Sequence, residues 1–417
     1  MSFMQEIAVP AGPAPDIGAF ATPLVNSVDV TIVMPCLNEL QSLPHCIRNA
    51  RLALDQLSEE HGFTGEIVIA DNGSTDGSQQ LATALGARVV DVDRRGYGAA
   101  LIGGCEGAWG RYILMGDCDG SYNFTEGVAM IAKLDEGHDV CMGSRFLGGI
   151  APGAMPWKNR YIGNPALSGI LNLFFRSGIE DAHCGLRAIR KEAFTRLKLT
   201  GSGMEFASEM VIKASLLKMN MTQVPATLSP DLRERAPHLR PWRDGWRHLR
   251  YLFMLSPTWV FGVPALAAVS LGLLILASAF ASAMGWSAAG PFGESWTVIG
   301  AMMVAVGHMA GLMAVASHLY GVREGYRLPK PWLLRFRKVL SLEGCVISGL
   351  ALVAASAAAL TGVGIYWGQE GFAALPSILP VTLGGLLGTI GLQTLFGGFL
   401  LAVLGGNEAD FLPASEG

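Results

Sequence analysis

The chain has 417 residues, 51% of them hydrophobic, and a formal net charge of −4 at pH 7. The length allows more than one domain, and the weak negative charge argues against a protein that binds nucleic acid through bulk positive charge. The seven cysteines show no CxxC pair and no His/Cys metal spacing, so we interpret them as packing residues in a reducing compartment.

The first 28 residues are rich in Pro, Ala and Gly, and no charged start precedes an apolar core. We therefore expect a flexible tail over 1–28 and no signal peptide. From residue 29, β-rich runs alternate with helical patterns; the predicted strands are DVTIVMP, EIVIA, ARVVDV and RYILM. This alternation predicts an α/β domain with a parallel sheet and helices on both faces. Ligands of such sheets bind at the carboxyl ends of the strands.

Polar residues gather where three of these strands end. The segments are PCLNE at 35–39, DNGSTDG at 71–77 and GDCDG at 116–120. Each segment alone could be a strand exit, a helix cap or a solvated loop. Together they indicate one ligand-binding crevice, because the carboxyl ends of parallel strands lie at the same edge of the sheet.

Asp117 and Asp119 stand one residue apart directly after a strand. Side chains at i and i+2 of a strand share a face, so the two carboxylates would repel each other unless a cation lies between them. Carboxylate oxygens suit Mg²⁺ or Mn²⁺, which commonly also hold substrate phosphates. The sequence has neither a GxGxxG opening a first helix nor a Walker P-loop, which disfavours a dinucleotide or ATP fold.

As an ordered set, these segments resemble the family-2 glycosyltransferases of GT-A fold. Within that family the resemblance is strongest to the polyprenyl-phosphate sugar synthases, such as dolichol-phosphate mannose synthase, and it spans about 29–250. The resemblance implies a nucleotide-sugar donor, a polyprenyl phosphate acceptor, a divalent metal and transfer with inversion. UDP-glucose is the favoured donor, with GDP-mannose as the alternative, and undecaprenyl phosphate is the expected lipid of a bacterial source.

The resemblance also assigns residues by their place in the matching segments. The nucleotide sugar would be bound by Pro35, Glu39, Asp71, Asn72 and Asp117, and the metal by Asp117 and Asp119. The catalytic set would comprise Asp119, Arg145 of GSRF, and Asp181 and Arg187 of DAHCGLRAIRKEAF. The chain departs from the family pattern at Leu37, where an aromatic is frequent, at Asn72, where a second Asp is frequent, and at Ser121, where Gln is frequent. Asn123 is a candidate replacement ligand for the metal.

A lipid monophosphate is largely dianionic at neutral pH, because its second pKa is about 6. It therefore needs cationic positioning rather than a strong base, and Arg233, Arg235 and Arg240 are the candidates for binding it. Trp and Arg repeat at helical spacing over 235–253, which predicts a basic amphipathic helix at the membrane interface, and 330–340 resembles a second one. A helix packed on the soluble domain is the alternative.

Two further pairs stand out. Glu205 and Glu209 lie one turn apart in a predicted helix over 203–216, where a contact to a donor hydroxyl and a solvated face remain open. Gly384 and Gly388 form a small-xxx-small pair that suits helix contact, within the chain or in a homo-oligomer.

Four stretches contain no Asp, Glu, Lys or Arg, namely 251–293, 295–322, 344–369 and 371–407. Each exceeds the ~20 apolar residues that a membrane helix needs, so we predict spans near 257–283, 296–318, 345–367 and 376–404; buried helices of a soluble protein are the alternative. All six Lys and Arg after residue 251 lie between Arg323 and Lys338. The positive-inside rule then places the loop 319–343, both termini and the catalytic domain in the cytosol, with the bacterial inner membrane as the expected location.

These expectations divide the chain into a tail (1–28), a GT-A domain (29–232), an interfacial segment (233–254), a four-helix membrane domain (255–407) and a second tail (408–417). Two other functions remain open. A processive polysaccharide synthase would carry a Gln-x-x-Arg-Trp motif, and no Arg-Trp dipeptide occurs in the sequence. A non-catalytic membrane scaffold would be favoured by loss of the Asp pair, which is intact.

Overall fold

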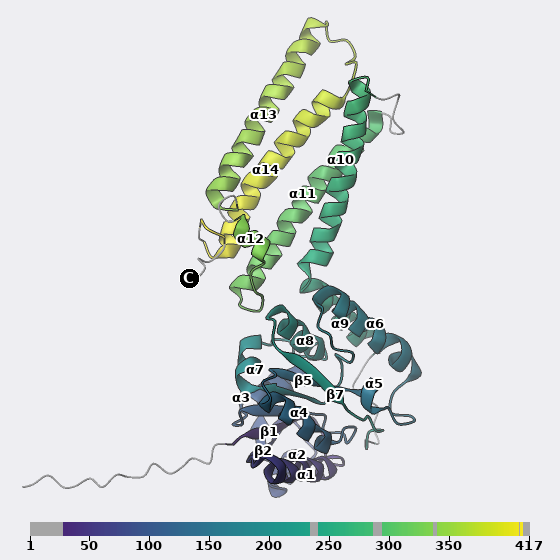
Figure 1. Cartoon of the computed structure of the whole chain (residues 1–417), viewed down its shortest axis with the longest axis vertical. Coiled ribbons are helices and arrows are strands. Elements are labelled where there is room, and N and C mark those ends of the chain that lie inside the picture. Colours follow the sequence, from purple (N-terminus) through teal and green to yellow (C-terminus); the bar gives the residue numbers. More distant parts are fainter. Residues whose placement is uncertain (1–27, 234–240, 287–293, 337–339, 408, 412–417) are drawn as a thin grey trace, which may run out of the picture.

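The computed structural model describes residues 28–233, 241–286, 294–336, 340–407 and 409–411. An α/β domain forms one end of the molecule, and a bundle of long helices rises from it (Figure 1). The predicted fold class, a sheet domain followed by four long apolar helices, is confirmed.

A seven-stranded sheet forms the centre of the α/β domain, with strand order β3-β2-β1-β4-β6-β5-β7. Strand β6 is antiparallel to both of its neighbours, β4 and β5, and the other adjacent pairs are parallel. The sheet is therefore mostly parallel, as predicted, with one reversed strand that the sequence pattern did not indicate. The strands are β1 (Val30–Cys36), β2 (Gly65–Asp71), β3 (Arg88–Asp91), β4 (Tyr112–Met115), β5 (Val140–Ser144), β6 (Arg187–Arg190) and β7 (Met221–Pro225).

Helices cover both faces of this sheet. Successive residues of β1 point to opposite faces: Ile32 and Met34 pack in a core cluster with α1, whereas Val33 packs in a second cluster with α3 and α8. Both clusters are built from buried aliphatic, aromatic and cysteine side chains. The helices of this domain are α1 (Leu43–His61), α2 (Ser78–Ala84), α3 (Tyr97–Glu106), α4 (Gly127–Asp135), α5 (Arg145–Gly148), α6 (Asn164–Phe175), α7 (Lys191–Leu197) and α8 (Phe206–Leu216).

The register of the strands brings the predicted polar segments to one edge. Cys36 of β1 pairs with Asp71 of β2, and Val33 of β1 pairs with Met115 of β4. Asp117 follows Met115 by two residues, so the Asp pair lies beside the end of β1. The reversed strand β6 begins with Arg187, which pairs with Met115 and with Met142 of β5, and so the segment before β6 reaches the same edge.

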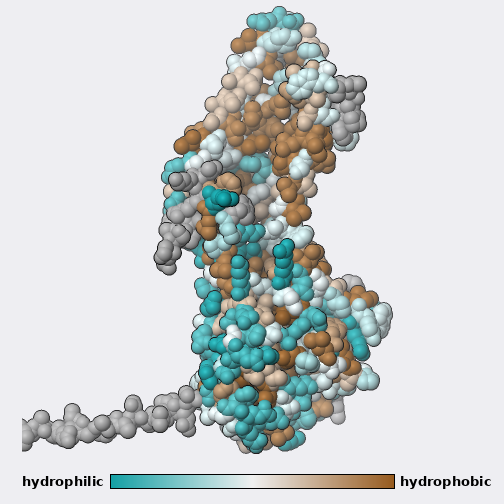
Figure 2. Space-filling model, in the orientation of Figure 1, coloured by the Kyte–Doolittle hydropathy of each residue, from teal (hydrophilic) through white to brown (hydrophobic). Residues whose placement is uncertain are grey.

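Four helices are long and apolar enough to cross a membrane, over Thr258–Ala283, Trp296–Arg323, Leu342–Gln369 and Leu379–Gly405. They correspond to the four predicted spans, and the second continues to Arg323. Their outer surface is largely hydrophobic (Figure 2). These helices are α10 (Val263–Ala283), α11 (Glu294–Arg323), α13 (Leu342–Gln369) and α14 (Leu379–Gly405).

Glycines let α13 and α14 approach closely. A Cβ atom on Gly391 would lie 2.8 Å from the carbonyl oxygen of Gly349, and one on Gly388 would lie 2.7 Å from the hydroxyl of Ser356. That hydroxyl donates to the carbonyl of Gly384 over 2.7 Å. The predicted glycine pair thus lies at a helix contact inside one chain, and a homo-oligomer through these helices stays a prediction.

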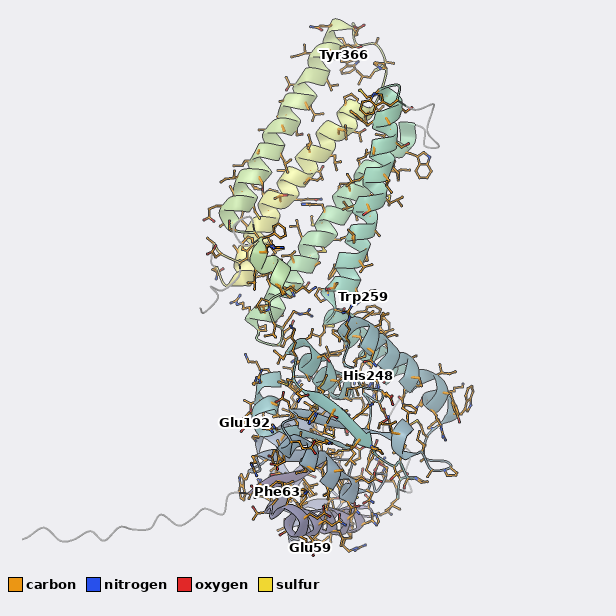
Figure 3. The ribbon with its side chains drawn as sticks, in the orientation of Figure 1. Glu59, Phe63, Glu192, His248, Trp259 and Tyr366 are labelled. Carbon is orange, nitrogen blue, oxygen red and sulfur yellow. The ribbon has the colours of Figure 1, made fainter. Side chains whose placement is uncertain are left out.

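Helix α9 (Pro241–Met254) lies where the bundle meets the α/β domain, and helix α12 (Pro331–Arg335) lies at the lower end of the bundle (Figure 1). Helix α9 packs against α6 and α8 and leads into α10. Phe174 of α6 stacks on Trp259 at a centroid distance of 5.3 Å, and Figure 3 shows Trp259 at the foot of the bundle, with Tyr366 at its far end. Helix α12 has only five residues. The amphipathic helix expected over 330–340 is therefore shorter than predicted among the residues described there, and its Leu333 is buried in the bundle.

Candidate active site

Two pockets meet at the edge of the sheet where the strands end. The strand-edge pocket has a volume of about 550 Å³, and its lining includes Pro35, Glu39, Asn72, Arg95 and Arg243. The helix-side pocket has a volume of about 530 Å³ and is lined by Tyr122, Arg145, Asn159, Gly163, Asn164, His183, Arg187, Asp231, Gly245 and His248, among others. Five residues line both pockets: Tyr97, Asp117, Asp119, Met204 and Arg233. The predicted Asp pair therefore lies at the junction between the two spaces.

The two aspartates have different environments. Asp117 accepts a hydrogen bond from the hydroxyl of Tyr97 over 2.8 Å, and burial together with the neighbouring Asp119 raises the pKa of Asp117 to about 6. Asp119 accepts from the backbone N–H and the hydroxyl of Ser121, at 3.0 and 2.6 Å. Ser121, which stands where the resembling family often has Gln, thus orients the second carboxylate.

Arg233 lies among acidic side chains beside the Asp pair. Its Nη2 atom is 2.6 Å from Asp119 and 3.1 Å from Asp231, and its Nη1 atom is 3.3 Å from Glu39. The guanidinium of Arg233 therefore places a positive charge at the junction of the two pockets. Arg233 is predicted from the sequence to bind an acceptor phosphate, and in the structure it lies between carboxylates in the wall of both pockets. Arg235 and Arg240, assigned with it, lie outside the described residues.

The donor set fits a hard divalent cation. Two carboxylates lie on one loop, and the cationic side chain of Arg233 already pairs with one of them. Carboxylate oxygens are the ligands that Mg²⁺ and Mn²⁺ prefer. Among the described residues, no group of three or more His, Cys, Asp or Glu side chains has the arrangement of a complete metal site. Asn123, the candidate third ligand, caps the turn at 124–126 and also bonds Asn49, so it is occupied structurally. Any further ligands would come from substrate phosphate and water, as is usual for Mg²⁺.

A buried ion pair closes the segment between β5 and β6. Arg145 forms a bidentate contact with Asp181, with both N–O distances 2.7 Å, and the backbone N–H of Arg145 adds a third bond at 3.1 Å. Both side chains are almost fully buried. Asp181 therefore orients Arg145, whose guanidinium lines the helix-side pocket.

Arg187 is the largest fully buried side chain of the described residues. Its guanidinium donates to the carbonyl oxygens of Cys184 and Ala207, whereas its Nε atom is buried without a partner. The guanidinium also lies 3.9 Å from the sulfur of Met210 and 5.9 Å from the ring centroid of Phe206, both uncharged groups. Its positive charge therefore lies beside the helix-side pocket, where Asp117 also lies. Asp117, Asp119, Arg145 and Arg187 thus line one pocket, and Asp181 contacts it through Arg145; their assignment as a catalytic set stays a prediction.

The residues assigned to the nucleotide divide into two groups. Pro35, Glu39, Asn72 and Asp117 line the strand-edge pocket. Asp71 is not among the lining residues; its carboxylate accepts from the N–H groups of Gly73 and Ser74 and from Gln79. Although burial acts in the opposite direction, the hydrogen bonds from Ser74 and Gln79 lower the pKa of Asp71. Asn72 organises the turn after β3, where its amide bonds the backbone of Val92, Arg94 and Gly96.

Several pocket residues were missed by the sequence analysis, among them Arg95, Tyr97, Tyr122, His183 and His248. Arg95 and Tyr97 follow strand β3, so the rule that polar residues at strand ends form the crevice could have found them. His248 comes from α9 and reaches the site only through tertiary packing, which the sequence pattern does not encode. Glu209 is buried and paired with Lys213 at 2.7 Å, so the solvated face, one of the two alternatives left open for it, is wrong. Glu209 also lines neither pocket, which gives no support to a donor contact.

Comparison with known proteins identifies relatives of both parts of the chain. Residues 31–198 match the family "Glycosyl transferase family 2", and residues 315–405 match "Glycosyltransferase family 2 C-terminal transmembrane region". The chain is 33% identical over 379 residues to the low-salt glycan biosynthesis hexosyltransferase Agl6 of Haloferax volcanii, covering 90% of this chain and 89% of that protein. It is 26% identical over 197 residues to the dolichyl-phosphate hexose transferase of the same organism, covering 47% of this chain and 81% of the relative.

Solved structures with related folds include the glucosyl-3-phosphoglycerate synthase of Mycobacterium tuberculosis in complex with Mn²⁺, UDP and glucosyl-3-phosphoglycerate. The identity is 19%, the coverage is 55% of this chain and 78% of that chain, and the TM-score is 0.39. The mannosyl-3-phosphoglycerate synthase of Rubrobacter xylanophilus aligns at 18% identity over 54% of this chain and 72% of that chain, with a TM-score of 0.41. The near full-length likeness to a hexosyltransferase, together with both regional matches, shows that this chain is a membrane-associated member of glycosyltransferase family 2.

Proposed function

We propose that the chain transfers a hexose from a nucleotide sugar to a polyprenyl phosphate, with UDP-glucose as the favoured donor and GDP-mannose as the alternative. The observation that carries the proposal is the pair of pockets that share the Asp117–Asp119 loop. Family membership supports a hexosyltransferase, and the dolichyl-phosphate hexose transferase among its relatives supports a lipid phosphate acceptor.

In this proposal the strand-edge pocket holds the nucleotide. Pro35, Glu39 and Asn72 line it, and the Asp pair at its inner end faces the diphosphate. A divalent cation held by Asp117 and Asp119 would neutralise the charge that develops on the leaving diphosphate. Tyr97 and Ser121 fix the two carboxylates through their hydroxyl groups, so the loop is oriented before substrate arrives.

The helix-side pocket would hold the sugar and the acceptor phosphate. Arg145 and Arg187 supply positive charge there, and Asp181 prevents Arg145 from rotating away. An oxygen of the acceptor phosphate attacks the anomeric carbon, and the bond from that carbon to the diphosphate breaks with its electron pair leaving on the nucleotide. A single displacement inverts the configuration, so an α-linked donor gives a β-linked lipid product.

The wall of this pocket nearest the bundle supports a lipid acceptor. Gly163 and Gly245 line it from two different helical segments, and a Cβ atom on Gly245 would meet no atom within 4 Å. The outer side of the same segments exposes large apolar groups, including Tyr161 and Trp246 at 67% and 61%. A polyprenyl chain could follow this side to the membrane while its phosphate reached the arginines.

Mass spectrometry of lipid products tests the proposal. The full-length protein, in nanodiscs that contain undecaprenyl phosphate and Mg²⁺, is given UDP-glucose and GDP-mannose in parallel. We expect a hexosyl phosphate lipid, its loss with EDTA, and its loss in Asp117→Asn and Asp119→Asn. Asp55→Asn, an exposed acid on α1, is the matched control and should retain full activity. Absence of any lipid-linked hexose, or full activity of the Asp117→Asn/Asp119→Asn double variant, would contradict the assignment.

A further inference from the structure

Three polar side chains from three different segments form a chain of hydrogen bonds beside the helix-side pocket. The Nε2 atom of His183 lies 3.1 Å from the hydroxyl of Ser208 on α8, and that hydroxyl lies 2.7 Å from Nδ1 of His248 on α9. The two rings also meet edge to face, with centroids 4.7 Å apart and an interplanar angle of 88°. Figure 3 shows His248 where α9 meets the catalytic domain. We call these three residues the His–Ser–His relay.

The relay joins the catalytic segment to the helix that enters the membrane domain. His183 follows Asp181 by two residues and precedes Arg187 by four, so its position is tied to both. Helix α8 holds the same segment a second time, because the carbonyl of Ala207 accepts from Arg187 over 3.3 Å. On the other side, α9 is joined to α10, in the first membrane span, by a short connection that includes the π-helical turn Thr258–Gly262.

A serine hydroxyl has one hydrogen and must donate it to one histidine while accepting from the other. The protonated nitrogen of each ring is therefore set by the other ring. Burial, followed by the charges of His248, Arg145 and Arg187, holds the pKa of His183 well below its usual value, so that this ring is neutral at pH 7. Which histidine donates to Ser208, and which accepts from it, therefore depends on the positions of both α8 and α9.

The presence of a histidine at this position carries an energetic cost. The Nδ1 atom of His183 is buried and has no hydrogen-bond partner. An apolar side chain would fill the same space without an unpaired polar atom, and unpaired buried polar atoms are rare in native proteins for this reason. The compensating feature that the structure offers is the contact of Nε2 with Ser208.

We propose that His183 is a positioning residue, through which the seating of helix α9 sets the placement of Asp181 and Arg187 in the active site. Both histidines line the pocket that also contains Arg145 and Arg187. The opposite side of α9 exposes Trp246 and Phe253, at 61% and 42%, groups suited to the bilayer interface. When these side chains enter the bilayer, the relay holds the catalytic segment in register with α9. The inference rests on the proposed transfer reaction and adds a dependence on the lipid surface.

The test uses Ser208→Ala in the full-length protein, because this change removes both hydrogen bonds and keeps both rings. Ser215→Ala is the matched control: it lies on the same helix, and the hydroxyl of Ser215 donates to the carbonyl of Val211 four residues earlier, within the helix itself. Activity is measured with undecaprenyl phosphate in phosphatidylcholine nanodiscs and in detergent micelles, and donor binding is measured by calorimetry.

For Ser208→Ala we expect kcat in nanodiscs to fall about ten-fold, as two neutral hydrogen bonds warrant, with donor affinity unchanged. The ratio of nanodisc to detergent activity should approach one in this variant and stay at the wild-type value in Ser215→Ala. His248→Phe should cost about as much, and the double variant no more than either single variant. A purely structural role would instead lower stability and leave the ratio unchanged.

Equal kcat and an equal nanodisc-to-detergent ratio in Ser208→Ala and wild type would overturn the inference while the transferase assignment stood. If the wild-type protein formed no lipid-linked hexose, the proposed function would fail separately. In that case backbone amide hydrogen exchange tests the relay. Ser208→Ala should raise the exchange rate in both 181–187 and 241–254, and Ser215→Ala should raise it in neither segment. Unchanged exchange in these two segments would likewise overturn it.

Discussion

Arg233 offers a sharp test of the charge balance at the Asp pair. A divalent cation that binds the Oδ2 atom of Asp119 competes with Arg233 for that oxygen, because the Arg233 Nη2 atom lies 2.6 Å from it. The contact is shielded from solvent, with 16% of the arginine side chain and 11% of the aspartate side chain exposed. A hydrogen bond to a charged group contributes about 1.5–3 kcal/mol. At about 1.4 kcal/mol per factor of ten, the contact lowers cation affinity by roughly ten- to a hundred-fold. Arg233→Gln should therefore bind Mn²⁺ more tightly than wild type by that factor.

The assay is Mn²⁺ titration followed by electron paramagnetic resonance, which requires no turnover. Without metal, the variant should melt at a lower temperature than wild type, since Glu39, Asp119 and Asp231 lose their shared cation. Saturating Mg²⁺ should restore more of the melting temperature in the variant than in wild type. Arg111→Gln, at an exposed ion pair with Asp29, controls for the loss of one charge. Equal or weaker Mn²⁺ binding by Arg233→Gln would refute competition between Arg233 and the metal.

Three further outcomes are expected. Although burial acts in the opposite direction, the hydrogen bond and charge of Lys213 lower the pKa of Glu209. Ionised Glu209 therefore stabilises the fold above its unfolded pKa of about 4.3, and this contribution is lost as pH falls through the folded pKa. The melting temperature below pH 5 should decline more steeply for wild type than for Glu209→Gln. Gly391→Ala, whose Cβ would meet a backbone oxygen at 2.8 Å, should lose about 1–3 kcal/mol in thermal unfolding, whereas Gly385→Ala, with nothing within 4 Å, should lose none. Gly245→Leu should raise KM for the lipid several-fold and change donor KM much less, because Gly245 lines only the helix-side pocket, which would hold the sugar but not the nucleotide of the donor; a change confined to donor KM would reverse the assignment of the two pockets.

The sequence could predict the strand-edge part of the site because strand ends, charge and spacing are local. PCLNE and GDCDG follow strands that are recognisable from β-branched residues, and the parallel rule alone brings them together. The four membrane spans could also be predicted from the sequence, since their length and lack of charge are properties of contiguous residues. The boundaries of the predicted domains were drawn from the same local signals and stay predictions.

The remaining features depend on where the chain returns in space. The position of Arg233 follows from the segment before it, which runs beside the Asp loop: the N–H of Leu232 donates to the carbonyl of Asp119, and that of Ser229 to Ser121, both at 2.9 Å. No periodic pattern in the sequence predicts this contact. The sequence also does not predict the reversed direction of β6, because the residue pattern of a four-residue strand does not differ between parallel and antiparallel pairing. The relay needs α9 to lie across α8, which only tertiary packing decides.

The reversed strand has a consequence for how this protein can diversify. Strand β5 ends at Ser144 and β6 begins at Arg187 on the same edge of the sheet, so residues 145–186 leave and re-enter the scaffold at neighbouring points. The Arg145–Asp181 pair fastens this excursion at its two ends. The exposed part of such an insert can change in length and composition without disturbing the strands that hold the Asp pair, provided that Leu171 and Ile179, which are buried in the same core cluster as Met115, stay apolar. Grafting 146–180 from one relative into another would then exchange acceptor preference as a unit, with the nucleotide half of the enzyme left as it was.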